Sequence, residues 1–144
     1  MGMKENKARI ERTKTTISPM LTVRKGTEAL EFYKKSFGAI ELSRHVRPDG
    51  GVVAELEIDG ALFGVADESR EAHNLSPVTL SGTTVRINLV VGDPDAVAAR
   101  AIVAGARSLF AVADQPYGWR QGRVVDPFGH HWLIGKPLET PPRP

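Results

Sequence analysis

The chain has 144 residues, of which 41% are hydrophobic and 25% charged, the composition of an ordinary globular domain. No apolar run approaches the about 18 residues of a membrane-spanning helix, and the lack of cysteine excludes disulfides, thiol catalysis and cysteine-bound zinc. Residues 1–14 carry five basic and two acidic side chains. This segment therefore has a net charge of +3, and the remaining residues have a net charge of −1, which gives +2 for the whole chain. We predict a flexible basic leader over residues 1–16. Because no aromatic residue lies among its charges, we expect no nucleic-acid partner. Because the chain shows no hydrophobic signal region, no apolar span and no cysteine, we expect a cytoplasmic protein without a membrane partner.

Residues 17–67 predict a strand, a helix and three further strands. The first strand is expected at 17–24. The helix that follows has an apolar stripe over 29–37, with Thr27 as its expected N-cap and Gly38 as its expected end. Three strands separated by glycine-containing turns complete this unit: 40–46, 52–58 and 62–66.

After a polar connector at 68–82, the same order is predicted for residues 83–136. Asp93 or Asp95 opens the helix and Gly105 ends it. Residues 114–121 are expected to form a loop, and Asp-Pro-Phe-Gly at 126–129 has the chemistry of a tight turn. The predicted strands of this second unit are 85–91, 108–112, 122–125 and 132–134.

Two copies of one βαβββ unit therefore predict a single α+β domain over 17–137, with a C-terminal tail at 138–144. Each unit covers one face of its sheet with its own helix. The other face needs a different surface, and two such sheets that curve toward each other form a cup.

Particular motifs make this pattern specific. The run FYKKSFGA ends the first helix, and DQPYGWRQGRVVDPFGH occupies residues 114–130. With the paired βαβββ units, these runs resemble the vicinal oxygen chelate superfamily, which includes glyoxalase I, bleomycin-resistance proteins and extradiol dioxygenases. The similarity is greatest to its PhnB-like branch and covers residues 17–136. It implies curved mixed sheets around a cup.

The same resemblance bears on metal binding, because enzymes of this superfamily hold a divalent ion with His and Glu residues on the first and last strand of each unit. These positions fall on Ser18, Gly64, Arg86 and Leu133. None is a usual ligand of a divalent ion, and Arg86 would repel one. The adjacent His130 and His131 point to opposite faces of a strand and cannot converge on one ion. We therefore predict neither a metal nor another cofactor.

Alternation along the last strand places His131 and Leu133 on the cup face and Trp132 on the other face, under a helix. His131 is then either a hydrogen-bonded wall residue or a ligand contact, and it is the candidate general base. Arg86, with Asn88 beside it, could hold a carboxylate, phosphate or phosphonate, or could be a surface arginine. The loop residues Tyr117, Trp119, Arg120 and Arg123 suit closure over a planar or anionic ligand. Packing of the loop against the helix of the other unit or a second subunit is the alternative.

Three functions are consistent with these residues. The first is a metal-independent homodimer that binds a small organic ligand, anionic or aromatic, in its cup, as bleomycin-resistance proteins do by sequestration. The alternative is a glyoxalase-like lyase or isomerase, or a dioxygenase-type enzyme, that uses His131 or a recruited divalent metal. The third is an interaction protein that uses the basic leader. We predict the first.

Overall fold

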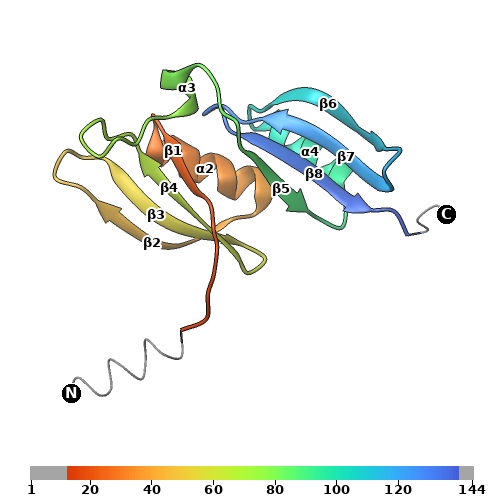
Figure 1. Cartoon of the computed structure of the whole chain (residues 1–144), viewed down its shortest axis with the longest axis horizontal. Helices are drawn as coiled ribbons and strands as arrows, with labels where there is room; N and C mark the ends of the chain where they lie inside the picture. Colours follow the sequence, from red (N-terminus) through yellow and green to blue (C-terminus); the bar gives the residue numbers. More distant parts are fainter. Residues whose placement is uncertain (1–12, 140–144) are drawn as a thin grey trace.

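The computed structural model describes residues 13–139, and its first half is a four-stranded sheet covered by one helix (Figure 1). The predicted leader lies mostly outside the described residues, as do the last five residues of the predicted tail. The strands lie in the order β1 (Met20–Val23), β4 (Ala61–Asp67), β3 (Val52–Ile58) and β2 (Ile40–Val46), and helix α2 spans Gly26–Phe37. β1 is parallel to β4, and the other pairs are antiparallel.

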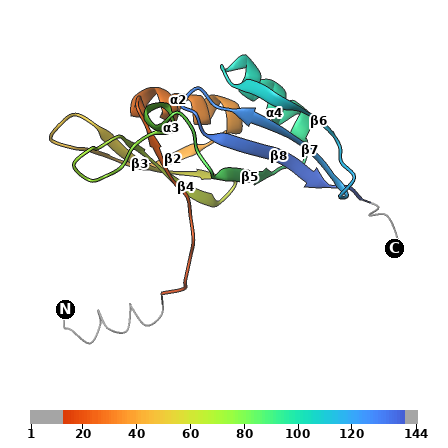
Figure 2. The same ribbon diagram turned by 45° about the horizontal axis from the view of Figure 1, so that its top comes forward.

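The second half repeats this arrangement. Its strands lie in the order β5 (Arg86–Val90), β8 (His131–Pro137), β7 (Trp119–Val125) and β6 (Arg107–Asp114), with helix α4 at Pro94–Val103. Both helices lie on the same side of the two sheets (Figures 1 and 2), so the opposite face of each sheet carries no helix. We call these two helix-free faces the open faces. The α+β fold of two βαβββ units is confirmed. None of the helices within residues 13–139 has the length and apolar character needed to cross a membrane.

The start of α2 differs from the prediction. Thr27 is not its cap: the helix begins at Gly26, whose N–H donates to the Asp67 carboxylate over 2.7 Å. A side chain at Gly26 would overlap Val52 and that carboxylate, so only glycine fits here. The end of the helix is as predicted, because Gly38 has φ +67° and returns its N–H to the Lys34 carbonyl oxygen.

One hydrophobic core serves both halves. Trp132 of β8 is only 1% exposed, and its ring centroid lies 4.7 Å from that of Phe37 and 5.5 Å from that of Tyr33, both on α2 of the other unit. The prediction that Trp132 packs under a helix is confirmed, with the helix coming from the first unit. The two halves therefore bury their aromatic residues against each other.

Asp126, in the turn between β7 and β8, ties this core together. Its buried carboxylate accepts hydrogen bonds from the Tyr33 hydroxyl at 2.5 Å and from the Trp132 indole N–H at 2.9 Å. It also accepts the backbone N–H groups of Phe128 and His130 within its own turn. One side chain thus shapes the turn and joins the two units.

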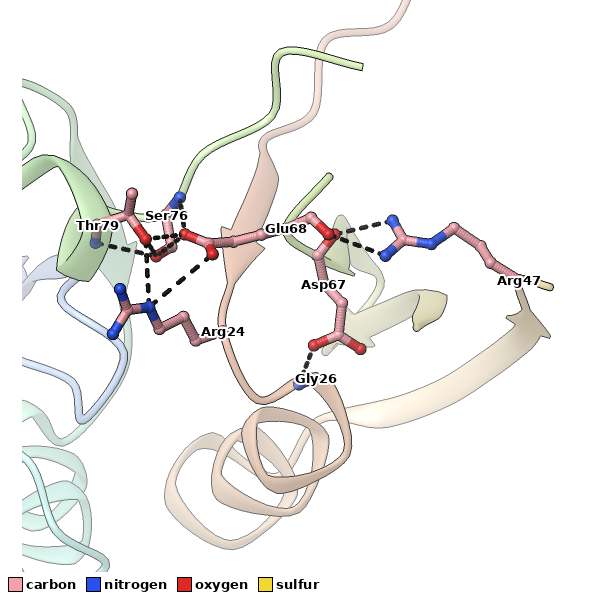
Figure 3. Close-up of polar contacts among 7 residues, drawn as sticks. All are labelled: Arg24, Gly26, Arg47, Asp67, Glu68, Ser76 and Thr79. Carbon is pink, nitrogen blue, oxygen red and sulfur yellow. Dashed lines mark hydrogen bonds and ion pairs between the residues drawn. The ribbon is translucent and has the colours of Figure 1, made fainter. Parts of the chain in front are cut away.

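The connector between the units contains a short helix, α3 (Pro77–Leu80), where the sequence predicted an irregular segment. Figure 3 shows how α3 is held: the Glu68 carboxylate accepts hydrogen bonds from the hydroxyls of Ser76 and Thr79 and from the Ser76 N–H, and Arg24 lies beside it. Arg47 binds the carbonyl oxygens of Asp67 and Glu68 from the other side, at 2.9 Å each. We call the contacts of Glu68 with Ser76, Thr79 and Arg24 the Glu68 network.

The Glu68 network predicts that part of the free energy of unfolding is lost at acid pH. The Ser76 hydroxyl, the Thr79 hydroxyl and the Ser76 N–H lower the pKa of Glu68 from 4.5 to about 2. A lowered carboxyl pKa stabilises the fold fully above the unfolded pKa and loses this effect as the pH falls toward the folded value. We expect Glu68→Gln to lose about 1–2 kcal/mol at pH 7, after allowance for solvent screening of this partly exposed group.

The measurement is urea unfolding of the native chain and Glu68→Gln between pH 7 and pH 2. The difference in the free energy of unfolding between the two proteins should shrink below about pH 4.5 and vanish near pH 2. Glu71→Gln is the matched control, because the side chain of exposed Glu71, in the same connector, makes no hydrogen bond or ion pair within residues 13–139. A loss for Glu68→Gln that stays constant over this pH range would contradict the expected linkage.

Candidate functional site

The open face of the second sheet carries most of the predicted site residues, in two neighbouring cross-strand rows. Buried Trp132, Ile134 and Val124 point toward the helices, so the alternate residues of these strands lie on the open face. In the strand register, the first row of open-face residues is Arg86, His131, Val125 and Arg107, and the second row is Asn88, Leu133, Arg123 and Phe110. Arg86, Asn88, His131 and Leu133 are thus brought together.

Three arginines of this face lie close to His131 in the strand register. Arg86 is its direct neighbour on β5, and Arg107 and Arg123 come from β6 and β7. No carboxylate of residues 13–139 forms an ion pair with any of the three. We call Arg86, Arg107 and Arg123 the arginine cluster. It is a concentration of positive charge without an internal counter-ion.

His131 accepts hydrogen bonds from one of these arginines. Arg123 approaches its Nδ1 atom with Nε at 3.0 Å and Nη2 at 2.8 Å. Because a guanidinium only donates, Nδ1 must be unprotonated and the neutral ring carries its hydrogen on Nε2. Burial lowers the pKa of His131, and the positive charges of Arg123 and Arg107 lower it further. The ring therefore offers an N–H donor rather than a free basic nitrogen.

The predicted loop residues divide between different places. Trp119 is the first residue of β7 and lies on the open face, opposite Pro137. Tyr117 stays in the turn and donates its hydroxyl hydrogen to Gln121 over 2.7 Å. Arg120 lies on the helix side, where it makes a two-pronged ion pair with Asp95 of α4, both contacts at 2.7 Å.

The position of Arg120 follows from strand length. The predicted loop 114–121 is shorter in the structure, because β6 ends at Asp114 and β7 begins at Trp119. Strand alternation then turns Arg120 away from the face that holds Trp119 and Arg123. Its pairing with Asp95 and Asp114 raises the Arg120 pKa above its usual value. Arg120 therefore does not belong to the arginine cluster.

The sequence did not predict Arg107 as a site residue, and it indicated Arg123 only as a cation of the loop. Arg107 reaches His131 through the pairing of β6 with β7, whose register shifts at irregularities between Ser108 and Ala113. Shifts of this kind leave no reliable sequence signal. Arg123 falls on the open face two residues after Gln121, as alternation requires once β7 is known to be a continuous strand.

The open face of the first sheet has the opposite charge. Glu55 and Glu57 of β3 lie on it, because alternate residues of a strand share a face, and Glu55 pairs across the sheet with Ser43. A cavity of about 310 Å³ on this face is lined by Ser18, Met20, Gly64 and Glu55, among others. The two open faces of one chain thus carry unlike charges.

The four positions at which the superfamily resemblance places metal ligands can be tested on this geometry. Ser18 and Gly64 meet at the first cavity, and Met20 covers Gly64 so closely that a side chain there would displace its thioether. In the second sheet, Leu133 offers no donor and Arg86 adds a positive charge. Within residues 13–139, no three His, Asp or Glu side chains are placed to hold a metal ion together. These residues do not fit the metal of the superfamily's enzymes.

Solved structures share this architecture. A protein of Arabidopsis thaliana superposes with a TM-score of 0.69 at 31% identity, over 86% of this chain and 100% of that one. TioX from Micromonospora sp. ML1 superposes with a TM-score of 0.65 at 25% identity, again over 86% of this chain and 100% of its own. The fosfomycin resistance protein FosX of Listeria monocytogenes has the same fold, with a TM-score of 0.68 at 13% identity over 88% of this chain and 93% of its own.

The amino-acid sequence agrees with the fold. An uncharacterized protein of Mycobacterium tuberculosis is 42% identical over 126 residues, which cover 85% of this chain and 74% of that protein. The sequence profile of the Glyoxalase/Bleomycin resistance protein/Dioxygenase superfamily matches residues 15–134. The chain therefore belongs to the glyoxalase/bleomycin resistance protein/dioxygenase superfamily.

Proposed function

We propose that this protein is a metal-independent binding protein of the PhnB-like branch that holds a small anionic organic ligand on the open face of its second sheet. The observation that supports this function is the arginine cluster: three cations on one face, next to His131, without a carboxylate partner in residues 13–139. Cations held together in this way repel one another until an anion joins them. Sequestration of the ligand needs no bond to be made or broken.

The surroundings of the cluster support an anionic organic ligand. Each guanidinium can donate two parallel hydrogen bonds to a carboxylate, phosphate or phosphonate. The Nε2–H of His131 and the amide of Asn88 add donors on either side. Leu133 and the exposed ring of Phe110 lie in the neighbouring row and can cover an apolar body, with Trp119 further along β7. An anionic head with an aromatic or aliphatic body satisfies all of these groups.

The open faces also favour a homodimer. Glu55 and Glu57 on the first sheet are complementary in charge to the arginine cluster on the second. Exposed apolar side chains lie on both faces, among them Met20, Leu62 and Phe110. A two-fold axis that sets the first sheet of one copy over the second sheet of another would match both contacts twice and close two cups. The ligand would then lie between an acidic wall and a basic wall.

We expect phenylphosphonate and benzoate, as probes, to raise the melting temperature of the metal-free chain and to bind less tightly as salt is added. Arg86→Gln and Arg123→Gln should each weaken phenylphosphonate binding about 10- to 100-fold, because a hydrogen bond to a charged group contributes about 1.5–3 kcal/mol. Isothermal titration calorimetry measures both. Sedimentation of the same samples reports the dimer.

Arg120→Gln is the matched control, since it removes an arginine of the same strand from the opposite face. Its affinity should equal that of the native chain. Equal losses in Arg120→Gln and Arg86→Gln would mean that general surface charge, and not this site, attracts the probe. A zinc, manganese or nickel ion that binds tightly and is required for the probe would favour the metal-dependent enzyme.

A further inference from the structure

A second cavity, of about 700 Å³, lies at the seam between the two units. Its walls come from β1, from the connector with α3, and from the start of β5, three segments that lie side by side in Figures 1 and 2. Most of its lining is apolar, including Leu21, Leu75, Pro77, Leu80, Val85 and Ile87. No Asp, Glu, Lys or Arg of the described residues lines it, which separates it chemically from the arginine cluster.

The apolar walls of this seam cavity face water. Leu80 is 61% exposed, Val85 59% and Met20 62%. Apolar side chains that remain this exposed around a hollow lose the stabilisation that burial would bring. A molecule that filled the hollow would bury these side chains and recover that stabilisation.

The Glu68 network lies behind one wall of the cavity. It ties Ser76 and Thr79 to Glu68 at the start of α3, the helix that contributes Pro77 and Leu80 to the lining (Figure 3). Its residues, Glu68, Ser76 and Thr79 of the connector and Arg24 after β1, are not part of the lining. The wall that α3 forms is thus anchored by contacts outside the hollow.

His130, which lines the seam cavity, has a ring nitrogen that can accept a hydrogen bond. The Nε2 atom of His130 lies 2.8 Å from the Thr22 carbonyl oxygen, and because a carbonyl only accepts, Nε2 must carry the hydrogen. In the neutral ring Nδ1 is then an acceptor, and it makes no hydrogen bond within the part of the chain that the structure describes. Thr22, Thr83 and Thr84 add polar atoms to the lining.

We propose that the seam cavity is a separate binding site for a small uncharged organic molecule with an apolar body and one hydrogen-bond donor. Ligand pockets of about 300–1,000 Å³ with apolar walls and a few polar groups are typical of such sites. The site is independent of the proposed function, because it shares no residue with the arginine cluster. A bound molecule would contact both units at once and stabilise their association.

The probe is N-phenyl-1-naphthylamine, an uncharged fluorophore with two aromatic groups and one N–H donor. We expect its fluorescence to rise saturably with one molecule bound per chain. Thr84→Trp, at an exposed position of the lining, should fill the hollow and weaken binding at least tenfold. Leu80→Glu, which puts a charge on the wall, should do the same without added bulk. Val46→Trp is the control, because exposed Val46 lies on the far edge strand β2.

Several results would overturn the proposal. Binding to Thr84→Trp and Leu80→Glu that equals native binding, with both variants folded by circular dichroism, would place the probe elsewhere. If Arg86→Gln no longer bound N-phenyl-1-naphthylamine, or if phenylphosphonate displaced this probe, the probe would be bound at the arginine cluster. Binding that disappears as the chain concentration rises would assign the cavity to a contact with a second copy. Failure of phenylphosphonate to bind anywhere would leave the expected seam-cavity result unchanged.

Discussion

Asp126→Ala should lower the free energy of unfolding by about 3–5 kcal/mol, because each buried donor left without an acceptor costs about 1–3 kcal/mol and the losses within one network do not add fully. The carboxylate serves four donors: the Tyr33 hydroxyl, the Trp132 indole and two backbone N–H groups of its turn. Burial, with the Asp126 carboxylate next to it, raises the pKa of Tyr33 well above its usual value. The hydroxyl therefore stays a donor over the working pH range.

Urea unfolding at pH 7 measures this loss. Tyr33→Phe removes one donor and keeps the carboxylate, so it should cost only about 1 kcal/mol. Asp49→Ala is the matched control in an exposed turn, where the carboxylate accepts the Gly51 N–H over 2.8 Å. It should cost far less than Asp126→Ala, because an exposed carboxylate is screened by water. If Asp126→Ala were no more destabilising than Asp49→Ala, the carboxylate would not hold the two units together.

Trp132→Ala should cost about 3–5 kcal/mol, the range for removal of a large aromatic side chain from a packed core. The indole ring is nearly fully buried and lies 4.7 Å from the Phe37 ring and 6.0 Å from the Phe63 ring, both of the first unit. The substitution therefore leaves a cavity where the two units meet. Because the remaining core still spans both units, unfolding should stay a single transition.

Trp119→Phe is the control for Trp132→Ala, since Trp119 is the other tryptophan and lies half-buried on the open face. Its effect on stability should be below about 1 kcal/mol. Calorimetry gives the number of transitions, and tryptophan fluorescence follows the residue that remains in each variant. Two separate transitions in Trp132→Ala would show that this side chain alone couples the units.

Much of the local structure could be predicted from short stretches of sequence. The repeat, the helix end at Gly38 and the turn at 126–129 follow from glycine conformation, turn chemistry and periodicity, all of which act over a few residues. The shared face of His131 and Leu133 follows from strand alternation in the same way. The residues at the superfamily's metal positions could also be read directly, although the position of Met20 over Gly64 could not.

The parts that were missed depend on residues far apart in the chain. Asp67 lies 41 residues from Gly26 and decides where α2 begins. Glu68 orders α3 across the connector, and the β6–β7 register brings Arg107 toward His131. The true start of β7 turns Arg120 to the helix side. No periodicity within one segment encodes contacts of this kind.

By itself the sequence determined the two βαβββ units, their family and the residues available for a ligand, because these depend on spacing along the chain. Only the tertiary structure decided that Arg86, Arg107 and Arg123 share a face and that Asp126 joins the units, because strand register and core packing set those neighbours. The physical reason is that a charge acts on whatever lies within a few ångströms of it, at any distance along the chain.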